Sequence, residues 1–503
     1  MKRRTFVQSA AAAASVAALP SLSRGANAMA STRYDFVIVG AGTAGLPAAI
    51  FASRRGAKVL LIDAAEDVGG TLHLALGQVS AAGSTLQKSK GIKDSPDIHF
   101  DDVMRLSNGF ADPNVARLTV TEAPATINWL LGAGLVPLPG HPEKGEAPGR
   151  DGYSVARYLW GAEGGRSILA VIRKELAPEI ESGRITLQLS TRVTGLLTDD
   201  SGAVTGVRAA HKGEDVQFHG RHVLITTGGY AMNPVRFEQL MNLPPYAGTS
   251  YPWQLGDGLD LAVSVGGYLR GRGLHRAGTG SILTSDHFPA KVYARFHTTP
   301  QVRQPWEIWV NDAGRRFIRE DEPRVVKREA ALIVQPQLRY RIVFDQAILD
   351  AAPVGVPDWS KDKLVSHFDT HSMFARADTL EALAAKTHID AAGLLQTVRD
   401  YNAAVRRKGG DAFGREHLPM PIEKGPFYAV THLGHSATSA AGVVVDAQMR
   451  VLRGDGKPVP NLYATGEVLG SGALLGNAFV PGMMLTPSLA IGRWLGMTLP
   501  IGA

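Results

Sequence analysis

Short apolar runs bounded by glycine alternate with longer helical patterns over the first half of the chain. Residues 34–39 form such a run and predict a buried parallel strand, and residues 46–55 then have the pattern of a helix. Residues 58–62 predict a second strand. Further β-rich runs lie at residues 185–189, 204–210 and 222–226. This alternation is typical of an α/β sheet.

The pattern divides the chain into three blocks after its first 30 residues. Residues 31–281 carry the alternating pattern, and residues 435–503 return to glycine-rich strands and turns that end in a helix. Between them, residues 282–434 are richer in aromatic and charged positions. This middle block contains WEIWVNDAGRRFI, which predicts a hairpin around residues 312–314, and long helical patterns over residues 379–407. We therefore predict a discontinuous α/β domain with an inserted α+β cap.

The turn between the first predicted strand and helix is a candidate phosphate-binding loop. In GAGTAG, Gly40 permits a tight turn, Gly42 lets the backbone approach a pyrophosphate, and Gly45 lets the helix pack closely on the strand. The helix N-terminus adds donors and a positive dipole. Asp63 follows the second strand, where an acid bonds the ribose hydroxyls of an adenine dinucleotide. Ordinary glycine turns are the alternative interpretation of this spacing.

The first 28 residues resemble an export signal. They contain a basic start with adjacent Arg3 and Arg4, an Ala-rich middle too short to span a bilayer, and the cleavage-like triplet Ala26-Asn27-Ala28. Paired arginines favour the twin-arginine type, which exports folded proteins to the periplasm, and an ordinary secretory signal is the alternative. No later segment is apolar enough to span a membrane, so no transmembrane segment is expected in the mature chain.

Composition narrows the possible partners and redox groups. The net charge of +7 includes four basic residues within the first 28, and no long basic run follows, so nucleic acid is an unexpected partner. The chain has no cysteine, which removes disulfides, CxxCH haem attachment, thiolate iron–sulfur ligation and a thiol nucleophile. No metal site is expected. A flavin would therefore be the only redox centre.

Five strings together resemble a flavoprotein superfamily that includes fumarate reductases and 3-ketosteroid dehydrogenases. They are GAGTAG with Asp63, GGTLHLALGQVSAAG, GIKDSP, ITTGGY and NLYATGEVLG. The resemblance implies a Rossmann-like FAD-binding domain, with a separate capping domain that supplies substrate chemistry. The cofactor-binding residues that it implies are Gly40, Gly42, Ala44, Gly45, Asp63, Ala64, Gly69, Gly70, Thr71, Gly77, Thr227, Gly228, Gly229, Asp257, Gly466, Glu467, Asn477, Thr486, Ser488 and Leu489.

Some members of this superfamily bind FAD covalently through a histidine in the second string. In this chain the register puts Thr71 rather than His73 at that position, so we expect noncovalent FAD.

Counting from WVNDAGRRF aligns four residues of the middle block with fumarate reductase active-site positions: His287, Thr299, Arg303 and Arg324. The resemblance implies that Arg324 handles the proton on the carbon next to the one that accepts the hydride. It also implies that Arg303 and His287 polarise the substrate carbonyl or carboxylate. His435 lies near another substrate histidine of the family, but with altered spacing. A structural histidine and ordinary salt bridges are the alternative interpretations.

The chain also departs from both enzyme groups. Pro300 occupies the position of the fumarate reductase proton-relay acid, for which Glu320, Asp321 or Glu322 are candidate replacements. Leu474 occupies the position of a second carboxylate-binding arginine, so a dicarboxylate would lose its clamp. Val480 replaces the tyrosine that precedes Pro-Gly in ketosteroid dehydrogenases. An apolar wall is expected instead from Phe479, Val480, Met483, Met484 and Leu485, with core packing as the alternative for the methionines.

These observations predict an exported FAD-dependent oxidoreductase that forms or reduces a C=C bond next to a carbonyl or carboxylate. Its substrate would be a small enoate or enone, or the saturated form. Electrons would pass to or from a partner such as a cytochrome c or a quinol-linked protein. The alternatives are a flavin-dependent alcohol or amine oxidase or dehydrogenase, and a noncatalytic periplasmic flavin carrier.

Overall fold

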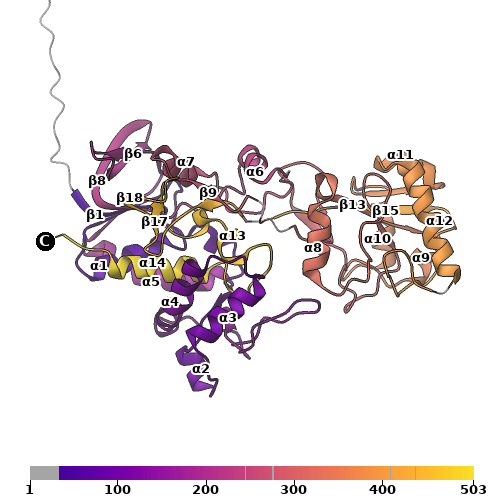
Figure 1. Cartoon of the computed structure of the whole chain (residues 1–503), viewed down its shortest axis with the longest axis horizontal. Coiled ribbons are helices and arrows are strands. Elements are labelled where there is room, and N and C mark those ends of the chain that lie inside the picture. The colour runs from indigo at the N-terminus through magenta and orange to yellow at the C-terminus, as the bar shows by residue number, and fades with distance from the viewer. Residues whose placement is uncertain are drawn as a thin grey trace, which may run out of the picture. The chain divides into compact units, whose positions relative to one another are not determined.

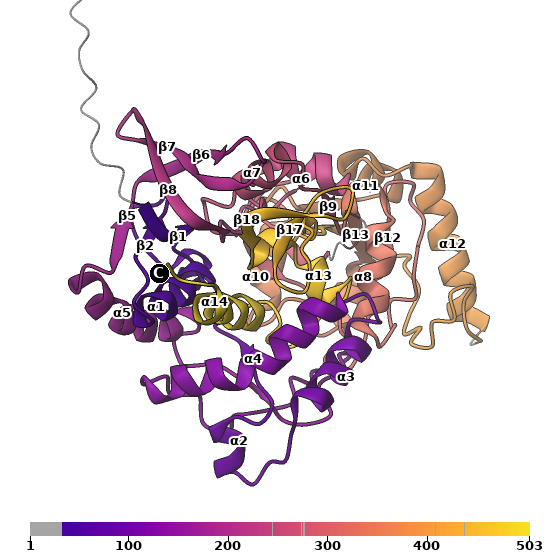
Figure 2. The same cartoon turned by 60° about the vertical axis from the view of Figure 1, so that its left-hand side comes forward.

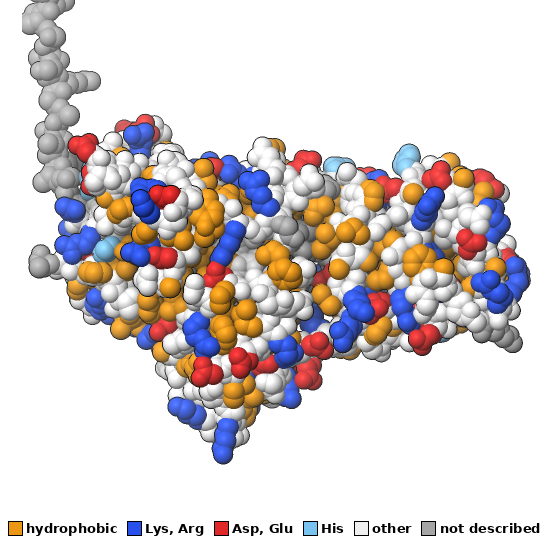
Figure 3. Space-filling view, in the orientation of Figure 1, with side chains coloured by type: hydrophobic (Ala, Val, Ile, Leu, Met, Phe, Trp, Pro, Cys, Tyr) orange, Lys and Arg blue, Asp and Glu red, His pale blue; other side chains and the backbone are white. Residues whose placement is uncertain are grey.

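The computed structural model describes residues 33–243, 245–272, 274, 277–407, 409–436 and 438–502. The predicted export signal lies outside these residues. None of the described helices combines the length and apolar character needed to cross a bilayer. On the face shown in Figure 3, basic and acidic side chains are interspersed rather than gathered by sign.

A mixed sheet organises the first half of the fold, with parallel strands in the order β18, β8, β1, β2, β5. Its strands are β1 (Arg33–Val39), β2 (Val59–Ile62), β5 (Ile185–Gln188), β8 (Glu214–Ile225), β18 (Pro458–Ala464), the antiparallel edge strand β17 (Arg450–Leu452), and the antiparallel extension β6 (Thr191–Thr198) and β7 (Val204–His211). The apolar runs therefore form the strands that the pattern predicts, and the mixed α/β class is confirmed.

The register of this sheet brings four loops together at one edge. Val39 pairs with both Ile62 and Ile225, and Ile225 pairs with Ala464. Because these strands are parallel, the residues that follow them leave the sheet side by side. The carboxyl edge of a parallel sheet is where such folds bind ligands.

Helices complete this part of the fold, and some of them pack against the sheet. They are α1 (Gly45–Arg54), α2 (Thr85–Ser89), α3 (Pro96–Leu106), α4 (Pro113–Gly132), α5 (Gly165–Glu181), α6 (Pro234–Met241), α7 (Asp257–Ser264), α13 (Gly472–Leu475), α14 (Thr486–Thr498) and the 3₁₀ turns η1 (Gly70–His73) and η3 (Glu467–Leu469). Helices α1, α5 and α14 lie together in Figures 1 and 2. A Cβ on Gly492 would lie 2.2 Å from the Ala44 carbonyl oxygen, so glycine lets α14 pack directly on the start of α1.

A second sheet, antiparallel in the order β12, β13, β15, β14, lies in the middle block. Its elements are β12 (Ile308–Val310), β13 (Arg339–Asp345), β14 (Phe374–Ala377), β15 (Phe427–Leu433), α8 (Val325–Ile333), α9 (Gln346–Ala351), α10 (Lys361–His367), α11 (Leu380–Thr387), α12 (Ala391–Arg407) and η2 (Pro336–Leu338). Three short ladders complete the fold: β3 (Val79–Ser80) with β4 (Tyr158–Leu159), β9 (Leu269–Arg270) with β16 (Gly442–Val443), and β10 (Ser281–Leu283) with β11 (Val292–Arg295).

The buried apolar side chains form two separate clusters. The first core draws on residues 34–262 and 440–499. The second core draws on residues 277–433 together with Tyr246 and Ala247. The chain thus enters the first core, builds the second core, and returns to complete the first.

The predicted hairpin around residues 312–314 is wrong. The turn forms, because the Gly314 amide donates to the Asn311 carbonyl. However, β12 pairs with β13 rather than with the segment after the turn. That segment instead supplies Arg316 and Glu320 to a buried ion cluster with Arg415 and Asp411. Buried ion pairing of this kind overrides a local strand pattern.

Candidate active site and cofactor cavity

A cavity of about 410 Å³ opens where the first sheet ends at its carboxyl edge. This volume is within the range of roughly 300–1,000 Å³ that is usual for small-molecule sites. Its lining includes the loops after β1, β2 and β8, the η1 turn, residues 249–254, the 466–467 turn and the start of α14. The four loops that the strand register brings together therefore build one site.

The glycine turn has the geometry that a bound phosphate requires. Gly40 has φ = +113°, and a Cβ there would lie 2.5 Å from the Thr226 carbonyl oxygen. A Cβ on Gly45 would lie 1.9 Å from the Gly40 carbonyl oxygen and 2.8 Å from Thr226 Oγ1. A Cβ on Gly42, in contrast, would meet no other protein atom nearer than 3.8 Å, at Gly70. Gly40 and Gly45 are thus required by the fold, whereas Gly42 leaves space open toward the cavity.

Asp63 is held by backbone donors at the end of β2. Its Oδ2 accepts from the Ala41 amide at 2.6 Å, and its Oδ1 accepts from the Ala65 amide at 2.8 Å. Burial raises the pKa of this carboxyl group, and the two backbone hydrogen bonds oppose that rise. Asp63 lines the cavity, where its fixed carboxylate is suited to accept hydrogen bonds from ribose hydroxyls.

Unpartnered buried polar atoms also face this region. Thr227 Oγ1 and Gln254 Oε1 belong to cavity-lining residues and have no hydrogen-bond partner in the described part of the chain. Glu467 also lines the cavity, and it accepts from Gln254 Nε2 at 2.6 Å and from the Ser439 amide at 2.9 Å. Burial raises the pKa of Glu467. Buried polar atoms without partners are rare in proteins, so a polar ligand such as a dinucleotide fits here.

Twelve of the predicted cofactor residues line the cavity: Gly40, Gly42, Ala44, Asp63, Gly70, Thr71, Gly77, Thr227, Gly228, Gly466, Glu467 and Ser488. The others do not line it: Gly45, Ala64, Gly69, Gly229, Asp257, Asn477, Thr486 and Leu489. Asp257 instead binds Arg192 through two hydrogen bonds of 2.7 Å. Thr486 Oγ1 accepts from the Ser80 amide at 2.9 Å. Residues 249–251, 253 and 254 line the cavity without matching any motif that the sequence offered.

Thr71 and His73 differ in their relation to the cavity. Thr71 lines the cavity, whereas His73 does not, and a His73 ring nitrogen lies 3.0 Å from the Val68 carbonyl oxygen. The expectation of noncovalent attachment stays a prediction that this placement supports.

The open side of the cavity is apolar. Leu74, Leu76, Trp253 and Met484 line it and are exposed, by 70% in the case of Leu76. Of the predicted apolar wall, Phe479, Met484 and Leu485 line the cavity. Val480 and Met483 are instead buried in the first core, as the alternative interpretation of the methionines allowed. The cavity thus combines a polar cradle with an apolar mouth.

A turn at residues 147–150 contacts both the cavity wall and the start of α8. The Gly149 carbonyl accepts from the Val325 amide at 2.9 Å. The next residue, Arg150, places its guanidinium carbon 4.3 Å from the centre of the Phe479 ring. Arg324 is the residue immediately before α8. The turn therefore connects the Arg324 segment with a side chain that lines the cavity.

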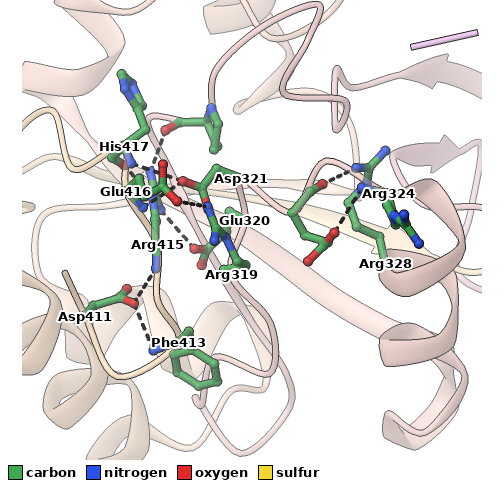
Figure 4. Close-up of polar contacts among 12 residues, drawn as sticks. Arg319, Glu320, Asp321, Arg324, Arg328, Asp411, Phe413, Arg415, Glu416 and His417 are labelled. Carbon is green, nitrogen blue, oxygen red and sulfur yellow. Dashed lines mark hydrogen bonds and ion pairs between the residues drawn. The ribbon is translucent and has the colours of Figure 1, made fainter. Parts of the chain in front are cut away.

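Thr299 and Arg324 both contact a third residue, Arg328, which the sequence patterns did not single out. Arg328 donates to Thr299 Oγ1 at 3.3 Å and to the Glu322 carbonyl oxygen. The Arg328 amide also donates to the Arg324 carbonyl at 3.3 Å. Figure 4 shows Arg324 and Arg328 next to each other at the start of α8. Its only signal in the sequence is its position one helical turn after Arg324.

The other predicted residues of the middle block lie elsewhere. Each nitrogen of the Arg303 guanidinium makes a hydrogen bond: two go to Glu307 at 2.5 and 3.0 Å, and one goes to the Pro353 carbonyl at 2.9 Å. The His287 side chain is 80% exposed and bonds Asp286. Neither residue, nor Thr299, Arg324 or His435, lines the cavity. In this arrangement Arg303 forms a salt bridge, as its alternative interpretation holds, whereas the exposed His287 is not a buried structural histidine.

The three acids proposed as proton relays have different environments. Glu320 is buried and binds Arg316 and Arg415. Burial raises the pKa of Asp321, but hydrogen bonds from Arg319 and from two backbone amides hold it below its ordinary value. Glu322 is partly exposed and accepts from the Arg324 amide at 3.0 Å. Figure 4 shows that Glu320 and Asp321 face the Arg415 side, away from Arg324.

Two histidines at the junction of the middle and last blocks are held neutral by burial. Burial, together with the nearby charge of Arg295, lowers the pKa of His435 to about 4. Burial lowers the pKa of His432 to about 3. His435 therefore offers a neutral ring to any ligand near pH 7, not a cation. Leu474, at the position of the missing arginine, is buried in the first core.

These pKa values predict that the protein loses stability as the pH falls. Such a histidine stays neutral in the folded protein but titrates near pH 6.5 in the unfolded chain. Below pH 6.5 the unfolded state therefore binds more protons than the folded state, which favours unfolding. We expect the free energy of unfolding to fall between pH 7 and 4.5. Replacing His432 by phenylalanine should remove roughly 2–3 kcal/mol of that fall. Urea unfolding of the wild-type protein and of the variant at pH 7 and pH 4.5 measures this difference. An equal fall in the free energy of unfolding in the two proteins would contradict the prediction.

Comparison with known proteins identifies the family. The model of the FAD binding domain family matches residues 35–478. The chain is 29% identical over 470 residues to the fumarate reductase (cytochrome) of Shewanella frigidimarina, covering 92% of this chain and 76% of the relative. It is 27% identical over 476 residues to the vinyl phenol reductase of Lactiplantibacillus plantarum, covering 90% of this chain and 92% of the relative.

A solved structure shares the fold. The 3-ketosteroid delta1-dehydrogenase from Sterolibacterium denitrificans gives a TM-score of 0.68 at 20% identity, over 92% of this chain and 98% of that chain. The expectations of FAD as cofactor and of an FAD-dependent oxidoreductase are confirmed by the family match. The chain belongs to the FAD binding domain family.

Proposed function

We propose that this protein is an exported FAD-dependent oxidoreductase that interconverts a C–C single bond and a C=C bond next to a carbonyl or carboxylate. In this proposal residues 31–281 and 435–503 form the FAD-binding domain, and residues 282–434 form a cap that closes over the cavity. The predicted export signal places the mature protein in the periplasm. The two curated relatives described above reduce alkenes by name, which supports the reaction class.

The proposal rests on one observation: a single cavity has polar lining residues suited to hold a nucleotide and an apolar opening. FAD, when bound, supplies a hydride donor or acceptor at its N5 atom. Gly42 leaves room for its phosphates, and Asp63 is placed for its ribose. The N-terminus of α14, where Ser488 lines the cavity, favours negative charge near the cofactor. Leu76 and Met484 then offer a surface on which an apolar substrate can rest.

The cap residues supply cations to the reacting group. Arg324 is exposed at the start of α8, and Arg328 lies one turn further along the helix. Positive charge there stabilises an oxyanion as negative charge builds on the substrate. Because an arginine holds its proton up to very high pH, we assign Arg324 the binding of that oxyanion as its first role. Leu474 provides no second clamp, which favours one carboxylate or carbonyl on the substrate rather than two.

An external redox partner completes the cycle. The sequence has no cysteine, so this chain cannot carry a CxxCH-attached haem or a thiolate-bound cluster of its own. Electrons would reach the flavin from a cytochrome c or a quinol-linked protein in the periplasm.

Anaerobic reoxidation of the flavin tests the proposal. Purified protein is photoreduced and mixed with a panel of enoates, enones and cinnamate-like acids while flavin absorbance is followed. We expect at least one C=C compound to reoxidise the flavin and to appear as its saturated product. Peroxide release with an alcohol or amine substrate in air would instead support an oxidase. Reduction by a partner without turnover of any panel member would support a flavin carrier.

A further inference from the structure

Arg328 differs from the other buried arginines of the protein in its electrostatic environment. Its side chain is 1% exposed. Among the residues that the structure describes, the five other buried arginines are Arg157, Arg303, Arg316, Arg341 and Arg415, and each forms an ion pair with a carboxylate. Arg328 has no ion pair with any residue that the structure describes. Its guanidinium donates only to neutral oxygens, those of Thr299 and the Glu322 backbone, and its Nε has no partner among those residues.

A buried cation without a counter-ion is costly. Removing an ion from water carries a penalty of several kcal/mol, which a nearby anion normally offsets. Burial lowers the pKa of Arg328, yet a guanidinium keeps its proton at any physiological pH. The positive charge therefore persists, and its field extends to the surroundings with little screening by water.

The field of Arg328 acts on the residues proposed to hold the substrate. Thr299 accepts directly from its guanidinium, and Arg324 lies one helical turn before it. The N-terminus of α8 adds a positive dipole at the same place. The carboxylates of Glu320 and Asp321 are engaged by Arg415 and Arg319 on the other side of the loop, as Figure 4 shows. The carboxylates of Glu322 and Glu329 act on Arg328 only through space, because neither forms an ion pair with its guanidinium and that of Glu322 accepts from the Arg324 amide.

We propose that Arg328 makes the substrate site select a substrate that carries a single carboxylate over its neutral analogue. This inference rests on the proposed function and names its substrate class. A substrate carboxylate bound at Arg324 supplies the negative charge that protein carboxylates supply to the five other buried arginines. Arg328 acts as a positioning residue: it holds Thr299 and the Glu322 carbonyl in place and acts on the substrate through its field. With the apolar cavity mouth, the favoured substrate is a monocarboxylate with an apolar or aromatic tail.

Ligand titrations test this selectivity without requiring turnover. Cinnamate and cinnamamide share their shape and C=C bond but differ in charge. Each is titrated into the oxidised, FAD-loaded protein while the flavin absorbance change reports binding. We expect the wild-type protein to bind cinnamate more tightly. Arg328→Gln should reduce that preference by about tenfold or more, which corresponds to about 1.4 kcal/mol.

Two further variants separate charge from packing. Arg328→Lys keeps the charge but loses the forked hydrogen bonds, so it should retain the preference for cinnamate. Lys327→Gln removes an exposed cation from the preceding position of the same helix and should leave the preference unchanged. If Arg328→Gln fails to fold, as its thermal unfolding and flavin content would reveal, the lysine variant still decides. A folded Arg328→Lys protein without the preference would overturn the proposal.

The outcomes distinguish this inference from the proposed function. Preference for cinnamate that depends on Arg328, without reoxidation of the reduced flavin by any C=C compound, would contradict only the proposed function. Turnover of enoates with an unchanged preference in Arg328→Gln would contradict only the inference. Equal binding of cinnamate and cinnamamide by the wild-type protein, or no binding of either, would also contradict the inference.

Discussion

Replacing Arg324 by alanine is expected to leave a folded, yellow protein whose turnover falls by about 10²–10³-fold or more. The residue is exposed and makes no side-chain capping bond to α8, so little stability depends on its side chain. Its proposed role is to bind the charge that develops on the substrate, and the loss of one such donor raises the barrier of the chemical step. Single-turnover reoxidation of photoreduced enzyme measures that step directly.

Two further variants, Arg324→Lys and Lys327→Ala, serve as comparisons for this experiment. Lysine keeps a point charge but loses the planar fork, so we expect it to restore only part of the activity. Lys327→Ala removes an exposed cation from the same helix and should behave as wild type. Unchanged activity in Arg324→Ala would remove the fumarate-reductase-like mechanism, while the FAD assignment would stand.

Gly42→Val is expected to abolish FAD binding without unfolding the protein. A Cβ at residue 42 meets no other protein atom nearer than 3.8 Å, so the apoprotein can accept the side chain. The added methyl groups would occupy the space through which a pyrophosphate approaches the backbone. We expect colourless protein with a cooperative thermal transition, and FAD affinity reduced by at least about a hundredfold, equivalent to about 2.7 kcal/mol. Fluorescence titration with FAD measures this affinity.

Gly40→Ala provides the contrasting result at a neighbouring position. Its Cβ would lie 2.5 Å from the Thr226 carbonyl oxygen in a backbone with φ = +113°, so this variant should be less stable even without FAD. Gly195→Ala is the neutral control, because it has open space around it and no positive φ. Tight FAD binding by Gly42→Val would mean that the phosphates bind elsewhere in the cavity.

The first core was predictable because its signals are local. The strand at residues 34–39, the glycine turn and Asp63 lie within 30 residues, and backbone sterics alone determine what each glycine does. The register of parallel strands then brings Gly40, Asp63 and Thr226 to one edge. Residues 249–254 escaped prediction, because they reach the cavity through a loop with no motif of its own.

The middle block was harder to predict because its structure depends on distant pairings. The segment after Gly314 has the composition of a strand, but its Arg316 and Glu320 are held by residues almost a hundred positions later. Arg303 gave a motif match, although Glu307, only four residues later, binds its guanidinium. Which charges are paired and which are left unpaired, as at Arg328, depends on three-dimensional packing that sequence spacing does not reveal.

The order of the two cores along the chain has a consequence for biosynthesis. Strand β18 and helix α14 border the cofactor cavity, yet both are translated only after the whole second core, residues 277–433, has left the ribosome. Nascent chains therefore cannot retain FAD while β1 and α1 emerge, and loading must wait until the returning segment docks.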